Sequence, residues 1–203
     1  MNSVDPTLDI SEFIFPINSR DIFKNNKDTV LEIGFGEGEF LVDLALKNDD
    51  WNFLGIEIKS HRFKKAVKHS KYNNLSNIKL LHIEAEVALK QVFDKNIFNA
   101  VYINFPDPWP KKKHVKHRIF HQDFIKNLAK VLKTGGRVNI KTDYHDYIKQ
   151  INNEFSKNKR FNNIYGINGY IMDTTNIVQT KFEKEFKEIG KEIFITAFTN
   201  LSN

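Results

Sequence analysis

At residues 31–38 the chain reads LEIGFGEG, with a glycine at every second position from Gly34 to Gly38. This stretch joins a β-rich run, Thr29–Ile33, to a run with helical periodicity that begins at Phe40. Closely spaced glycines let the backbone turn sharply between a strand and a helix, and they let a ligand approach the main chain. A strand, a glycine-rich turn and a helix in this order predict the first unit of a parallel sheet with a ligand site at its carboxyl edge.

The spacing of the glycines separates two classes of ligand. A dinucleotide-binding fingerprint has a third glycine three positions after the second, and that position is Glu39 here. Gly34, Gly36 and Gly38 instead follow the pattern Gly-x-Gly-x-Gly, which suits a nucleoside without a pyrophosphate. A nicotinamide-dependent dehydrogenase is therefore disfavoured.

The alternation of β-rich and helical segments continues along the chain, and it is typical of a parallel sheet covered by helices. The candidate strands are Thr29–Ile33, Asn52–Ile58, Ile78–Ile83, Ala100–Phe105, Arg137–Thr142 and Glu192–Thr199. Helices are expected from Phe124 to a stop at Gly135-Gly136, after Asp143 through Phe155, and near Thr180–Ile189. This pattern predicts an α/β, doubly wound fold. We expect residues 29–203 to form one domain, and residues 1–28 to be an N-terminal extension that is packed against it or partly disordered.

Composition narrows the class of protein. The chain has 203 residues, with 31 Lys and Arg against 25 Asp and Glu, so its formal net charge is +6 and a polyanionic partner is plausible. It has no cysteine, which excludes disulfides and thiolate metal sites, and no other metal site suggests itself. No run of about 18 apolar residues occurs. We therefore predict a cytoplasmic protein with no membrane span and no metal.

Carboxylates stand at three successive strand ends. Glu32 closes the first strand, Glu57 the second, and Glu84 follows the third. A carboxylate after the second strand of such a fold can accept both hydroxyls of a ribose, and Glu84 could meet the exocyclic amine of an adenine. Together with the glycine turn, these acids predict one shared ligand at the carboxyl edge of the sheet.

The fourth strand runs into the segment NFPDPWPKKKH at residues 104–114. Prolines on both sides of Asp107 fix the backbone, so its carboxylate is held at the strand end. Trp109 offers a stacking face, and five Lys or Arg residues with two histidines lie within Lys111–Arg118. A basic loop beside an aromatic residue is suited to grip phosphates and orient a base.

These segments, with Thr142-Asp143 and Thr180-Lys181-Phe182-Glu183, resemble the bacterial tRNA (guanine-N7)-methyltransferase family. The resemblance implies a Rossmann-like class I methyltransferase fold, with a mostly parallel sheet and a final antiparallel strand. It implies S-adenosylmethionine as cofactor and tRNA as partner. The implied cofactor-binding residues are Glu32, Gly34, Gly36, Glu57, Glu84 and Asp107, of which Asp107 is also catalytic. The implied tRNA-binding residues are Lys111, Asp143, Thr180, Lys181, Phe182 and Glu183.

The chain departs from the family pattern at three positions. Glu84 stands where the family usually has Asp, which adds one methylene to the expected adenine contact. Lys113 and His117 stand where the family tends to have Arg, and neither reproduces a bidentate guanidinium grip. We therefore expect weaker and more pH-dependent RNA binding.

Two other functions stay open at this point. An N6-adenine methyltransferase carries a related Pro-Pro-aromatic motif at the same strand end, but the order Pro-Asp-Pro-Trp and the Thr180–Glu183 segment argue against it. A non-catalytic RNA-binding protein with a relic cofactor pocket is disfavoured by the intact Glu32, Gly34, Gly36 and Glu57. Both a monomer and a homodimer fit the sequence.

Overall fold

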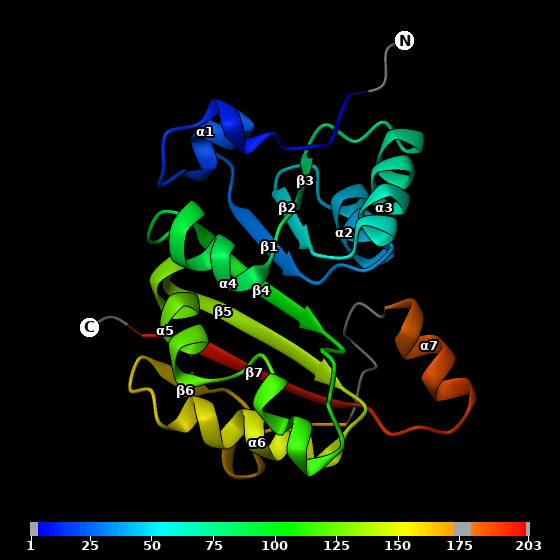
Figure 1. Cartoon of the computed structure of the whole chain (residues 1–203), viewed down its shortest axis with the longest axis vertical. Helices are drawn as coiled ribbons and strands as arrows, with labels where there is room; N and C mark the ends of the chain where they lie inside the picture. The colour runs from blue at the N-terminus through cyan, green and yellow to red at the C-terminus, as the bar shows by residue number, and fades with distance from the viewer. Residues whose placement is uncertain (1–3, 173–179, 202–203) are drawn as a thin grey trace.

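The computed structural model describes residues 4–172 and 180–201, and in these it forms one seven-stranded sheet of order β3-β2-β1-β4-β5-β7-β6 (Figure 1). The strands are β1 (Thr29–Ile33), β2 (Asn52–Glu57), β3 (Ile78–His82), β4 (Phe98–Asn104), β5 (Leu132–Thr142), β6 (Phe161–Asn163) and β7 (Phe194–Asn200). The first five strands pair in parallel, and β7 is antiparallel to both β5 and β6. The expected doubly wound sheet with a final antiparallel strand is confirmed. The short edge strand β6 was not predicted.

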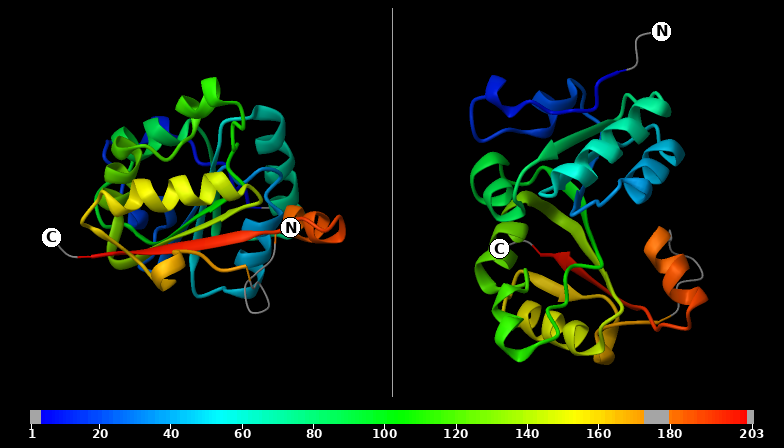
Figure 2. Two further views of the ribbon diagram at one scale, coloured as in Figure 1. Left: turned by 90° about the horizontal axis from the view of Figure 1, so that it is seen from below. Right: turned by 45° about the vertical axis from the view of Figure 1, so that its right-hand side comes forward.

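Helices cover both faces of this sheet (Figures 1 and 2). They are α1 (Ser19–Phe23), α2 (Glu39–Lys47), α3 (Ser60–Tyr72), α4 (Ala85–Val87), α5 (Gln122–Val131), α6 (His145–Ser156) and α7 (Lys181–Glu188). Short 3-10 or π segments are η1 (Ile10–Glu12), η2 (Ala88–Val92), η3 (Lys112–His117) and η4 (Gly166–Asn168). Helices α2 and α3 pack against β2 and β3, whereas α5 and α6 pack against β5 and β7. No helix among the described residues is long and apolar enough to cross a membrane.

The direction of strand winding reverses at β1. From β1 the chain moves outward to β2 and β3, and then returns to place β4 on the other side of β1. In an open parallel sheet, this reversal leaves a crevice at the carboxyl ends of the two central strands. Helix α7 lies at the same edge of the sheet (Figure 1).

Gly38 fixes how α2 enters this edge. It is the N-cap of α2, with a left-handed φ of 87°, and a Cβ added there would lie 2.7 Å from the Cβ of Ala66 in α3. A larger residue would therefore strain the backbone and push two helices apart. The third glycine of the motif serves helix packing.

The predicted end of α5 was wrong. The helix ends at Val131, and Gly135-Gly136 lie inside β5, where the pairing with β4 jumps from Phe98–Leu132 to Ala100–Arg137. The extra residues of β5 form a bulge, in which Gly135 takes a left-handed φ of 79°. A glycine pair after a helical stripe thus marks an irregular strand here rather than a helix stop.

The described part of the N-terminal extension packs against the sheet. The Leu80 amide donates to the Pro6 carbonyl (2.7 Å), and the Leu8 amide donates to the Leu80 carbonyl (2.8 Å), beside β3. Ile17 is fully buried, and its amide donates to the carbonyl of Val92. Residues 4–28 therefore add to the core beneath the sheet.

Candidate active site

Three adjoining hollows follow the carboxyl edge of the sheet, with volumes of about 420, 170 and 320 Å³. Gly34 lines all three. Glu57 and Glu84 line the first hollow, and Asp107 lines the second and the third. The third hollow is also lined by Glu32, Gly36, Asp143 and Thr180. The fold thus brings the expected cofactor residues to one groove.

The glycine turn presents bare backbone to this groove. Gly34 and Gly36 have left-handed φ values of 72° and 61°, and nothing lies within 4 Å of where their side chains would be. The Gly36 amide donates to Glu57 Oε2 (3.0 Å), while the Lys59 amide donates to Oε1 (2.8 Å). The buried Glu57 carboxylate therefore ties the end of β2 to the turn, and its expected contact with a ribose stays a prediction.

Glu32 is a buried acid without a full set of partners. Asn104 donates from Nδ2 to Glu32 Oε1 (3.0 Å), but Glu32 Oε2 and Asn104 Oδ1 are buried with no hydrogen-bond partner among the described residues. Burial raises the pKa of Glu32 to about 8, with smaller contributions from Glu39 and Glu57, and only the Asn104 bond opposes this. Two unsatisfied acceptors beside a cavity fit a cationic donor, such as the ammonium group of S-adenosylmethionine.

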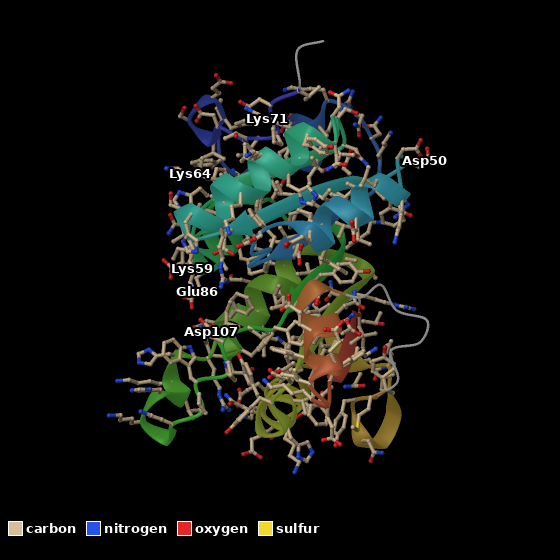
Figure 3. All side chains as sticks on the ribbon, turned by 90° about the vertical axis from the view of Figure 1, so that its right-hand side faces the viewer. Asp50, Lys59, Lys64, Lys71, Glu86 and Asp107 are labelled. Carbon is tan, nitrogen blue, oxygen red and sulfur yellow. The ribbon has the colours of Figure 1, made fainter. Side chains whose placement is uncertain are left out.

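The Asp107 loop leaves β4 in a strained conformation. Phe105 and Trp109 have φ values of 50° and 42°, which are uncommon for residues with a side chain. Between them, Asp107 is exposed at the mouth of the groove (Figure 3). It makes no ion pair with any residue that the structure describes, so its charge is available to a ligand.

Arg118 explains how this loop is held. Its guanidinium donates from Nε to the Pro108 carbonyl (2.7 Å), bonds to Gln150 in α6, and lies 4.6 Å from the ring centroid of Tyr147. Arg118 is only 7% exposed. Arg118 therefore holds the loop against α6, and the expected phosphate contact of this loop residue stays a prediction.

Other described cations of the basic loop are accessible. Lys111 and Lys113 are exposed. His114 and His117 pack around Trp109, with ring centroids 5.8 and 5.3 Å from that of the indole. Trp109 is 37% exposed, so it remains accessible to a stacking partner despite these contacts.

The Thr180–Glu183 segment forms the start of α7. Thr180 Oγ1 accepts from the Glu183 amide (3.0 Å), and the Glu183 side chain accepts in return from the Thr180 amide, which makes a capping box. Glu183 is fully buried, and its Oε2 lies 2.6 Å from Nζ of Lys141, which is also buried. The side chains of Lys181 and Phe182 lie outside what the structure describes.

Two further expected residues differ in their surroundings. Asp143 lies on the third hollow, and its Oδ2 is 2.6 Å from Nζ of Lys191. Glu84 is exposed and is the N-cap of α4, at the rim of the first hollow. Neither arrangement tests the predicted contacts with tRNA and adenine.

Sequence reasoning missed three residues of this site. In the sequence, Asn104 is only the start of the motif at residues 104–114, although its position at the end of β4 is a signal that marks it as a site residue. Lys141 and Arg118 look like surface cations in the sequence. Only the tertiary structure buries them beside Glu183 and Tyr147.

Comparison with known proteins identifies the family. The Methyltransf_4 family model, described as "Putative methyltransferase", matches residues 26–196. The tRNA (guanine-N(7)-)-methyltransferase of Thermotoga maritima is 35% identical over 93% of this chain and 59% of its own length. That of Buchnera aphidicola subsp. Baizongia pistaciae is 36% identical over 92% of this chain and 77% of its own. The chain thus spans less than two thirds of the Thermotoga relative.

Solved structures show the same architecture. The 16S rRNA methyltransferase KamB aligns with a TM-score of 0.62 at 12% identity, over 90% of this chain and 92% of its own. Identity this low carries only the fold, which is that of class I methyltransferases. The family model over residues 26–196 and the Buchnera relative, which is 36% identical and is covered over 77% of its length, show that the chain belongs to the tRNA (guanine-N(7)-)-methyltransferase family.

Proposed function

We propose that this protein transfers the methyl group of S-adenosylmethionine to N7 of a guanine in tRNA. One observation carries the proposal: acids suited to a nucleoside and an ammonium group share one groove with the rigidly mounted Asp107 carboxylate. The activity named for the relatives supports tRNA as the partner. We propose that residues 29–203 form the methyltransferase domain and that the reaction takes place in the cytoplasm.

Different residues of the groove suit different parts of the cofactor. Glu57 and Glu84, on the first hollow, suit the ribose hydroxyls and the adenine amine, whereas Glu32 and Asn104 suit the ammonium group. The turn that contains Gly34 and Gly36 leaves its backbone open to close approach. When bound, S-adenosylmethionine supplies a methyl group on a positively charged sulfur.

The target atom determines what the protein must contribute. Guanine N7 has a free lone pair on the base edge, so no general base is required and catalysis consists mainly of positioning. A carboxylate at the mouth of the groove can accept hydrogen bonds from guanine N1–H and the amino group, or stabilise positive charge that develops on the purine. Asp107 fits this role better than Asp143 or Glu183, because each of those is paired with a lysine.

The exposed residues around the groove are the candidates for contacts with tRNA. Lys111 and Lys113 can reach phosphates, and we retain Asp143, Thr180, Lys181 and Phe182 as tRNA-binding residues. For Glu183 we propose an indirect role, because its buried carboxylate holds the first turn of α7 through Thr180 and Lys141.

Methyl transfer from labelled S-adenosylmethionine into an unmodified tRNA transcript tests the proposal. The wild type should label the transcript, and Asp107→Asn should label it far more slowly. Failure of the folded wild type to label any tRNA while it binds the cofactor would contradict the proposed function.

A further inference from the structure

The positive charge of this protein is concentrated on one helix. Helix α3 and its N-cap residue Lys59 hold six of the 31 Lys and Arg residues and none of the 25 Asp and Glu residues. The remainder of the chain therefore balances at 25 residues of each sign. These six are Lys59, Arg62, Lys64, Lys65, Lys68 and Lys71.

The lysines of α3 share one face of the helix. Lys64 and Lys68 are exposed and one turn apart, and Lys71 follows after three more residues, whereas Ala66 and Ser70 on the other side are buried. At 1.5 Å per residue, Lys64 to Lys71 covers about 10 Å along the axis. A ridge of positive charge thus runs along the solvent side of α3.

This arrangement is unfavourable for the helix itself. Like charges one turn apart, such as Lys64 and Lys68, repel each other, and cations at the N-terminal end oppose the helix dipole. The first turn of α3 has no acidic residue, and no side chain caps it. Lys65 pairs with Glu37 and Lys71 with Asp5, but Lys64 and Lys68 form no ion pair with any described residue. The unbalanced charge therefore lacks a structural explanation within the described part of the chain.

Two other cations, at the N-terminal end of α3, line the groove. Arg62, from the first turn of α3, lines the second and third hollows together with Asp107, and Lys59 lines the second. Figure 3 shows Lys64, Lys59 and Asp107 on one side of the molecule, with the acidic Glu86 between the last two, and the loop that contains η3 projects on the same side. A nucleic acid whose target base lies at Asp107 could therefore extend its phosphate backbone along α3.

We propose that α3 is a second RNA-binding surface, which holds the phosphate backbone of tRNA away from the target guanine. The proposal rests on the proposed function, which puts tRNA in the groove. A protein partner would need apolar anchors, but Tyr72 is the only large apolar or aromatic side chain prominently exposed on the described α3, at 88%. Evenly spaced lysines instead match a polyanion, which they bind by releasing counterions.

The test is the salt dependence of tRNA binding. We compare the wild type with Lys64→Gln/Lys68→Gln, and with the matched control Lys126→Gln/Lys149→Gln, which neutralises exposed lysines of α5 and α6 on the other face of the sheet. Glutamine is a good helix former, so circular dichroism and cofactor affinity should stay unchanged. In a plot of the logarithm of the tRNA association constant against the logarithm of the salt concentration, the slope of the α3 variant should be smaller by about 1.4–1.8 than that of the wild type. At 0.1 M salt the variant should bind tRNA about 25- to 60-fold more weakly. The control should lose little of either.

Equal slopes for the wild type and the α3 variant would overturn the inference, and so would equal losses in the α3 variant and the control, because the effect would then be bulk charge. Binding to anionic vesicles that needs Lys64 and Lys68, with an unchanged tRNA slope, would assign the ridge to a membrane surface instead. A wild type that shows the α3-dependent slope but transfers no methyl group would contradict the proposed function and leave this surface intact.

Discussion

Glu32→Gln isolates the charge of one buried carboxyl group. Glutamine keeps the shape of the side chain and an oxygen that can accept from Asn104, but it cannot titrate. Burial raises the pKa of Glu32 to about 8 from a usual value of 4.5. The folded protein therefore holds a proton on Glu32 through a range of pH in which the unfolded chain has released it.

The sign and size of the effect follow from linkage. Because the folded state binds the extra proton, the free energy of unfolding falls as pH rises from 4.5 to about 8, by up to about 1.4 kcal/mol per pH unit from this group. Between about pH 5.5 and 8, the wild type should lose about 3 kcal/mol of stability relative to Glu32→Gln. Urea unfolding of both proteins across this range measures the difference, since all other groups titrate in both. Parallel stability curves would refute the raised pKa.

The same carboxyl group should couple cofactor binding to proton release. The amino group of S-adenosylmethionine is mostly protonated at about pH 6.5, because α-amino groups titrate near pH 8. An ammonium group beside Glu32 favours its ionised form, so binding should expel close to one proton from the wild type and none from Glu32→Gln. Calorimetry in buffers of different ionisation enthalpy counts these protons. Equal proton release in the two proteins would remove Glu32 from the ammonium site.

Three further substitutions test other parts of the groove. Asp107→Asn should slow the chemical step by roughly a hundredfold in single turnover at saturating tRNA and cofactor, and a wild-type rate would show that Asp107 is not catalytic. Glu57→Gln should weaken cofactor binding by about 1.5–3 kcal/mol, measured by calorimetry, because the ribose loses a charged acceptor, and unchanged affinity would place the ribose elsewhere. Lys141→Met should lower the free energy of unfolding by about 3 kcal/mol, because Glu183 loses its buried partner. The double variant Lys141→Met/Glu183→Met should recover most of this loss. Equal stability of the single and double variants would show that the pair does not hold α7.

Local patterns in the sequence predicted the sheet well, and they predicted that the acids would lie together at its carboxyl edge. The strand Thr29–Ile33 was predicted to the residue, and Glu32, Glu57 and Asp107 meet at one groove because parallel strands end at one edge. Alternation of strands and helices is local information, and the topology of a doubly wound sheet follows from it.

Features that depend on long-range packing were not predictable in this way. The glycine pair 135–136 became a bulge because β5 pairs with β4 across it, and the short β6 exists only beside β7. In the sequence, Arg118 and Glu183 look like solvent-exposed charges. In the structure, Arg118 is buried against α6, and Glu183 is buried beside Lys141. Their partners lie 32 and 42 residues away, which no window of sequence can reveal.

Mass spectrometry of nucleosides identifies which base and which atom the protein methylates. Unmodified tRNA transcript is incubated with the wild type and S-adenosylmethionine, digested to nucleosides, and compared with the same reaction of Asp107→Asn. We predict 7-methylguanosine as the product of the wild type and little of it from the variant. N6-methyladenosine as the product, or 7-methylguanosine formed equally by both proteins, would contradict it.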